Sequence, residues 1–282
     1  VSASLPKMSD YIIHANTPFL AFDCKDSFRH LSEKEKHYAH YLSKANWMGS
    51  LIICLQTSAE SPLIFSMLIK IFLNQSMKSL KRTALYVCNF SENEVQEKFV
   101  RLLKATKYSQ LFPQEMELIL SSCLESIYSF DDNKRHLGFP PTGTTTYLSK
   151  NFTPEDNEIV TEFLKKENIE VFNSRLFKTI DKTGTTCYEI RLASVLNTDD
   201  EGKEFLISES INSHKFIITH GDYSKLLKLV NGYLLLAKEY AANENEVQMI
   251  EKYIESFHTG SLAAHKDGSR FWVKDRSPTI ES

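Results

Sequence analysis

The first half of the chain has the apolar spacing that is typical of helices. After Ser32, an apolar residue recurs every three or four positions as far as Leu55, which predicts one long amphipathic helix. Ser32 and Glu35 have the Ser-x-x-Glu spacing of a capping box, in which the two side chains satisfy backbone N–H groups at the helix start. Three further helices are predicted in this half: Glu60–Phe72, one that opens at Ser91–Glu94, and one from Pro113 towards Phe130.

The middle of the chain changes to the pattern of short strands. Arg175–Ile180 and Thr186–Leu196 flank Asp181–Gly184, and this arrangement predicts a hairpin with a short glycine-containing loop. Polar and apolar residues alternate in the second strand, so it has one wet and one dry face. The dry face holds Tyr188, Ile190 and Leu192, and the wet face holds Cys187, Glu189 and Arg191.

The remaining elements complete an α+β pattern. Thr153-Pro154-Glu155 has the order of cap, proline and acid that opens a helix. Phe216–Thr219 is predicted to form a further strand. After Gly221-Asp222 the chain is predicted to be helical again to about His258, and Ser269–Lys274 has an extended pattern. Helices around a small antiparallel β core define an α+β fold. The expected segments are helical 24–135, β-rich 143–220 with one helix, helical 221–267 and an extended tail at 268–282.

Composition excludes several classes of protein. The formal net charge is −3 with both signs interspersed, which argues against a nucleic-acid-binding face. Val1–Tyr11 does not have the pattern of a signal peptide, and the longest apolar run, Leu51–Leu55, is far too short to cross a membrane. The five cysteines form no Cys-x-x-Cys pair, so we expect reduced thiols and a cytoplasmic location.

Candidate chemistry is sparse in the residues themselves. None of the nine histidines is followed by Glu, so the His-Glu-x-x-His helix of metallopeptidases is missing. Glu33, His37 and His40 could share one helix face as metal ligands, but a solvated helix face is the favoured interpretation because no second cluster supports them. No Gly-x-Ser-x-Gly elbow is present either. We therefore predict no catalytic and no metal-binding residue in this chain.

Several long stretches resemble a known peptidase family. They are Leu42–Phe72, Arg135–Phe177 (with RHLGF, TTTYLSKN and NSRLFK), Tyr188–Val195, Gly221–Tyr223 and Lys238–Ser282, which contains AHKDGSRFW. They cover nearly the whole chain in the same order as in dipeptidyl peptidase III, peptidase family M49. On these residues the chain is identified as a member of that family, in its amino-terminal part.

The resemblance implies a fold and an activity. Members are zinc-dependent exopeptidases that release dipeptides from the amino end of short peptides, and they have a helical zinc lobe and a mixed lobe with a barrel-like β core. Residues 1–282 would be one incomplete mixed lobe. The zinc motif of the family, His-Glu-x-x-Gly-His, does not occur in this sequence. Zinc is therefore expected in the full-length family protein and not in this chain, which alone should be inactive.

The resemblance also implies where substrate would bind. Glu281 and Ser282 lie in the segment whose Glu, in the family, holds the free amino group of the bound peptide. The Tyr that follows in relatives, and a cleft loop with Ser-Phe-Gly-Asp that would fall near Val100–Tyr108, are not in this sequence.

Two hypotheses remain for the chain. One is an incomplete piece of a peptidase, which would associate with the missing zinc lobe or with itself through a bare strand edge and an apolar face. The other is a short, non-catalytic isoform that binds peptides or proteins. Neither involves nucleic acid or a membrane.

Overall fold

The computed structural model describes residues 23–80, 95–129, 131–139, 142–167, 169–170, 172–197, 210–211 and 214–281. The chain forms two compact units. The first takes in residues up to His30 together with Ser66–Tyr128, and the second takes in Leu31–Phe65 together with Ser129–Ser282. The second unit is therefore built from two stretches that are separated in the sequence by most of the first.

The first unit is helical. Its helices are α1 (Lys25–His30), most of α3 (Ser61–Asn74), α5 (Val95–Lys104), α6 (Lys107–Leu111) and α7 (Pro113–Tyr128). Thr106 caps α6, and Lys70 on α3 forms an ion pair with Glu115 on α7. The helices predicted at Glu60 and Pro113 are confirmed, whereas the helix start predicted at Ser91–Glu94 lies outside the described residues.

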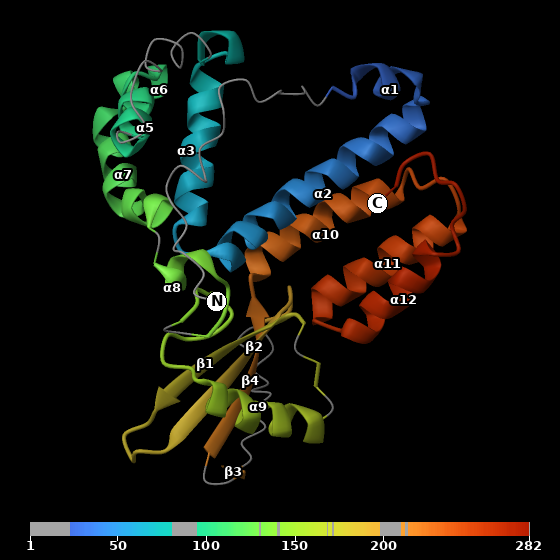
Figure 1. Ribbon diagram of the computed structural model, residues 1–282. Coiled ribbons are helices and arrows are strands. Elements are labelled where there is room, and N and C mark those ends of the chain that lie inside the picture. Colours follow the sequence, from blue (N-terminus) through green and yellow to red (C-terminus); the bar gives the residue numbers. More distant parts are fainter. Residues whose placement is uncertain are drawn as a thin grey trace, which may run out of the picture. The chain divides into compact units, whose positions relative to one another are not determined.

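In the second unit, four helices form a platform. They are α2 (Glu33–Thr57), α10 (Ser224–Lys238), α11 (Glu244–Thr259) and α12 (Leu262–Trp272), and Figure 1 shows α2 beside α10 and α11 beside α12. The predicted capping box of α2 is present, since the Glu35 carboxylate accepts from Ser32 N at 2.7 Å. The platform core is formed by Tyr38, Ala45, Val230, Leu234, Ala237, Ala241, Met249 and Ile250.

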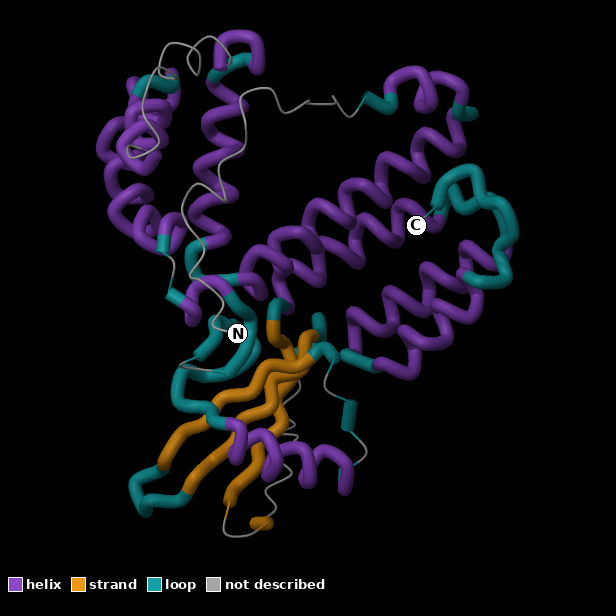
Figure 2. The backbone as a smooth tube through the Cα atoms, in the orientation of Figure 1, coloured by secondary structure: helices purple, strands orange, loops and turns teal. Residues whose placement is uncertain are grey.

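A small mixed sheet forms the other half of this unit, together with the short helix α8 (Asp132–Arg135) and α9 (Pro154–Lys166). Its strands β1 (Ser174–Ile180), β2 (Thr186–Ala193), β3 (Ser210–Ile211) and β4 (His214–Asp222) lie in the order β1-β2-β4-β3 (Figure 2). The predicted hairpin of β1 and β2 is confirmed. The α+β class, mostly helical around a small sheet, is also confirmed.

The direction of one strand pair differs from the antiparallel core that the sequence predicts. β2 and β4 run parallel, with Cys187 opposite Lys215 at one end and Ala193 opposite Asp222 at the other. A hydrophobic pattern fixes which face of a strand is buried but not the direction of its neighbour. The described strands form an open sheet and do not close into a barrel.

Helix α9 covers one face of the sheet (Figure 1). Phe163 on α9 stacks on Phe216 of β4 with ring centroids 4.1 Å apart, and Tyr188 and Ile190 of β2 are fully buried in the same cluster. The predicted dry face of β2 is thus the face that packs on α9. Cys187, assigned to the wet face, is also buried, at 8% exposure, and this burial raises the pKa of its thiol.

The predicted extended tail at 268–282 is wrong in its first part. Residues 268–272 belong to α12, which begins after the Ser261 cap. Gly268 allows α12 to pack closely on α11, because a Cβ at this position would lie 2.7 Å from the Tyr253 ring of α11. The chain becomes non-helical only after Trp272.

Asp156 joins α9 to the sheet by buried polar contacts. Its carboxylate accepts from the Tyr188 hydroxyl at 2.6 Å, from Lys178 Nζ at 2.9 Å and from the Thr153 backbone N–H at 2.8 Å. Burial opposes ionisation, yet the hydrogen bonds from Lys178, Tyr188 and Thr153 outweigh it and lower the pKa of Asp156. The same carboxylate raises the pKa of Tyr188, which is already raised by burial.

We predict that Asp156→Asn lowers the free energy of unfolding by about 3 kcal/mol at pH 7, because Lys178 is left without its counter-charge in a mostly buried place. Since the folded-state pKa of Asp156 is lowered, its contribution is present above the ordinary aspartate pKa and is lost as pH falls through the folded value. Urea melts at pH 7 and pH 3 test this. Glu158→Gln, an exposed acid on the same helix, should change stability by less than about 0.5 kcal/mol.

Candidate functional site

The sheet passes into the helical platform at the end of β4. Asp222 ends the strand, Tyr223 is the N-cap of α10 and the helix begins at Ser224. Gly221 has φ 96°, and a Cβ there would lie 2.9 Å from the Asn197 side chain, so glycine is required. Tyr223 has φ 58°, a left-handed conformation that costs about 1 kcal/mol for a residue with a Cβ.

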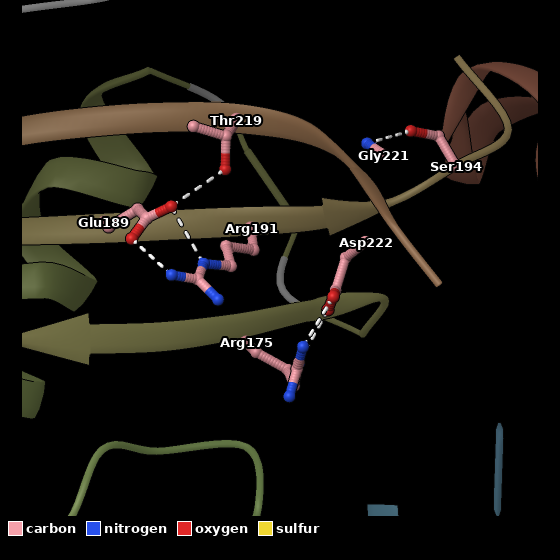
Figure 3. A network of polar contacts seen from close by, with 7 residues as sticks. All are labelled: Arg175, Glu189, Arg191, Ser194, Thr219, Gly221 and Asp222. Carbon is pink, nitrogen blue, oxygen red and sulfur yellow. Dashed lines mark hydrogen bonds and ion pairs between the residues drawn. The ribbon is translucent and has the colours of Figure 1, made fainter. Parts of the chain in front are cut away.

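A forked ion pair holds this junction. Arg175 of β1 donates from Nε to Asp222 Oδ2 at 2.6 Å and from Nη2 to Oδ1 at 2.5 Å (Figure 3). The side chains are 21% and 8% exposed, so the pair is largely shielded from solvent. The guanidinium also lies 4.7 Å from the ring centroid of Tyr223. Its hydrogen bonds to Asp222 raise the pKa of Arg175 despite burial, so the group stays charged.

A second forked pair lies on the neighbouring strand. Arg191 donates to Glu189 from Nε at 2.8 Å and from Nη2 at 2.9 Å, and the Thr219 hydroxyl donates to Glu189 at 3.3 Å (Figure 3). Arg191 is directly opposite Arg175 in the β1–β2 register. The guanidinium carbon of Arg191 lies 4.1 Å from the centroid of the Phe177 ring. That of Arg175 lies 5.3 Å from the same centroid. Both guanidinium groups thus lie against one aromatic ring, and each has its own carboxylate.

The loop after β2 ties the sheet to the end of α11. Ser194 accepts from Gly221 N at 2.9 Å (Figure 3). The backbone N–H groups of Val195 and Leu196 donate to the carbonyls of Phe257 and His258, each at 2.9 Å. These bonds fix the sheet and the platform against each other within the second unit.

The two arginine–carboxylate pairs form an arginine network that is suited to stabilising the fold and not to making or breaking covalent bonds. Each guanidinium is committed to a carboxylate, and the network contains no nucleophile paired with a base. Within the described ranges, no group of three or more His, Cys, Asp and Glu side chains could hold a metal ion. That the zinc site of the family lies outside this sequence stays a prediction from the resemblance.

The histidines considered as metal ligands pack on aromatic rings. His37 stacks on Tyr240 of the platform with centroids 4.7 Å apart, and His40 meets Tyr41 edge-on at 5.2 Å. Glu33 forms an ion pair with Lys36 instead. The helix-face interpretation of these three residues is the one that fits the described structure.

The predicted substrate residues lie on the tail that follows α12. Glu281 is exposed, and Ser282 lies outside the described residues. The neighbouring Ile280 packs against the platform core of α2, α10 and α11. The arginine network comes from β1, β2 and β4, and Glu281 is not one of its members. Sequence reasoning missed the pairing of Arg175 with Asp222, since no local pattern links residues 47 positions apart.

We predict that Arg175→Met lowers the free energy of unfolding by about 3 kcal/mol, because Asp222 is left buried without its cation. Arg191→Met is the matched control on the paired strand, and because that pair is more exposed, at 39% and 26%, it should cost about 1 kcal/mol or less. Thermal or urea unfolding measures both. Equal losses in the two variants would contradict a special role for Arg175.

Among the helices that the structure describes, none is long and apolar enough to cross a bilayer.

Comparisons with known proteins agree with the resemblance in the sequence. The model of peptidase family M49 matches residues 119–282. Dipeptidyl peptidase 3 of Rattus norvegicus is 36% identical over 307 residues, that of Nematostella vectensis 39% over 315, and that of Dictyostelium discoideum 31% over 296. These matches cover 97–98% of this chain but 42–43% of each relative. The chain thus spans about two fifths of the length of the curated relatives it matches, and it belongs to peptidase family M49.

Proposed function

We propose that this chain is the amino-terminal part of a zinc-dependent dipeptidyl peptidase, which releases dipeptides from the amino end of short peptides. The observation that carries the proposal is the continuous family match over residues 119–282, which includes the tail with Glu281. Relatives named dipeptidyl peptidase 3 support the same reaction class.

In this proposal the chain binds substrate and does not activate water. A bound zinc ion would lower the pKa of its water from about 15.7 to about 7. That shift corresponds to roughly 12 kcal/mol at about 1.4 kcal/mol per unit. No side chain in this sequence can replace it, and the residues that would hold the ion belong to the remainder of the family protein. The cytoplasmic location stays a prediction.

Glu281 would contact the amino group of the peptide. An α-amino group with a pKa near 8 is protonated at neutral pH, so the exposed Glu281 carboxylate attracts it by roughly 1 kcal/mol. The attraction would grow when the rest of the protein excludes water from the pair. Ser282 follows directly in the chain and would extend the same contact segment.

We expect the purified chain to release no dipeptide from a dipeptidyl-arylamide substrate, with or without added zinc, because it lacks a metal-activated nucleophile. Release of the arylamine is measured by fluorescence. Turnover above background that a chelator abolishes would overturn the assignment of catalysis to residues outside this chain. Peptide binding without turnover would agree with the short, non-catalytic binding module as well.

Glu281→Gln should weaken the binding of a short peptide with a free amino end by about fivefold, the equivalent of roughly 1 kcal/mol. The same peptide with an acetylated amino end should bind both proteins equally. Calorimetry or fluorescence anisotropy measures the affinities. Glu239→Gln, an exposed acid at the end of α10, is the control and should leave binding unchanged; an equal loss in both variants would sink the proposed anchor.

A further inference from the structure

The tail that joins α12 to Glu281 is short and contains a strained turn. Its first three backbone N–H groups, at residues 273–275, donate to carbonyls of the last turn of α12 at 3.0–3.1 Å. Ser277 then has a φ of 56°, which is costly for a residue with a Cβ. It is followed by Pro278, and a proline restricts the conformation of the residue before it. Such a turn persists only where contacts on both sides of it hold the chain in place.

On the near side of the turn, the tail is held by the residue that caps α11. Asn243, the N-cap of that helix, donates from Nδ2 to Asp275 Oδ1 at 2.9 Å. Its Oδ1 accepts from the backbone N–H of Glu246 at 3.1 Å. The helix thus uses the amide oxygen and the tail uses the amide nitrogen. An ionised Asp caps a helix equally well, but it has no hydrogen to donate.

On the far side of the turn, the contact is apolar. Ile280 packs against the core of α2, α10 and α11, and the adjacent Glu281 is exposed. Apolar packing is non-directional, whereas a hydrogen bond requires a defined distance and angle. The bond to Asp275 therefore sets the course of the tail as it leaves α12, and Ile280 ends that course one residue before Glu281.

We propose that Asn243 is a positioning residue, whose amide nitrogen fastens the tail through Asp275 and thereby places the carboxylate of Glu281. The proposal rests on the proposed function, because it takes Glu281 as the anchor for the amino group of the peptide. The fastening itself is a property of this chain and does not depend on what binds there.

Asn243→Asp separates the two roles of this side chain. Aspartate keeps the cap, but it cannot donate to Asp275, and at pH 7 it places a second carboxylate beside it. Hydrogen exchange of the intact chain at pH 7 measures the result, because the N–H groups of Lys274 and Asp275 are hydrogen-bonded at the start of the tail. Their protection should fall by about fivefold, as expected for the loss of one exposed hydrogen bond.

Three further variants show whether the hydrogen bond is responsible. The exchanged pair Asn243→Asp/Asp275→Asn returns a donor to the contact, now from residue 275 to residue 243, and should restore protection to within about twofold of the wild type. Asn243→Asp/Asp275→Ala removes the repulsion between carboxylates without returning a donor, so its protection should stay low. Glu244→Gln changes an exposed acid in the first turn of α11 and should keep wild-type protection.

Peptide binding measures the consequence for Glu281. Asn243→Asp should weaken the binding of a short peptide with a free amino end by about threefold, less than Glu281→Gln does, because the carboxylate is present but less well preorganised. The exchanged pair should bind this peptide as the wild type does. The peptide with an acetylated amino end should bind all of these proteins equally.

Wild-type protection in Asn243→Asp, or low protection in the exchanged pair, would overturn the role of Asn243. Wild-type affinity of Asn243→Asp for the free peptide would overturn it as well, provided that Glu281→Gln does weaken binding. Failure of Glu281→Gln to weaken binding would instead count against the proposed function alone, and hydrogen exchange would still decide whether Asn243 fastens the tail.

Discussion

The forked ion pair between Arg175 and Asp222 is the interaction on which the second unit depends. It joins the first residues of β1 to the last residue of β4, and Asp222 is followed directly by the left-handed Tyr223 that starts α10. Because desolvating both charges is costly, such a pair tolerates only one geometry. The direction of α10 follows from it, and α2 and α11, which pack on α10, take their places from that direction.

The unit therefore has two kinds of stabilising contact with different roles. Apolar clusters on α9 and on the platform supply the driving force for burial, and they tolerate substitutions of similar volume. Polar contacts of Asp156 and Arg175, largely shielded from solvent, fix how the layers are oriented. Under the proposed function, the chemistry would depend on residues supplied by a second part of the family polypeptide, and this chain would contribute the orientation of the tail with Glu281.

Much of the fold is readable from local patterns. The caps at Ser32 and Thr153 and the hairpin loop at Asp181–Gly184 are where the sequence predicts them, since each depends on residues within a few positions. The parallel pairing of β2 with β4 and the packing role of Gly268 depend on partners distant in sequence. The periodicity of apolar residues gives no information about such partners. The substrate role of Glu281 is predicted only from the resemblance to a family, because an exposed acid near a chain end has no distinguishing pattern of its own, and it stays a prediction.

The division of the second unit into two separated stretches has a consequence for synthesis on the ribosome. Helix α2 ends at Thr57, but α10, which covers its apolar face, begins only at Ser224. At about 5–20 residues per second, α2 would wait roughly 10–40 s for its partner. During that interval the face around Tyr38, Ala45 and Ile52 would be exposed, and transiently exposed apolar surface of this kind is prone to aggregation. Translation speed between these two helices should therefore influence the yield of folded protein.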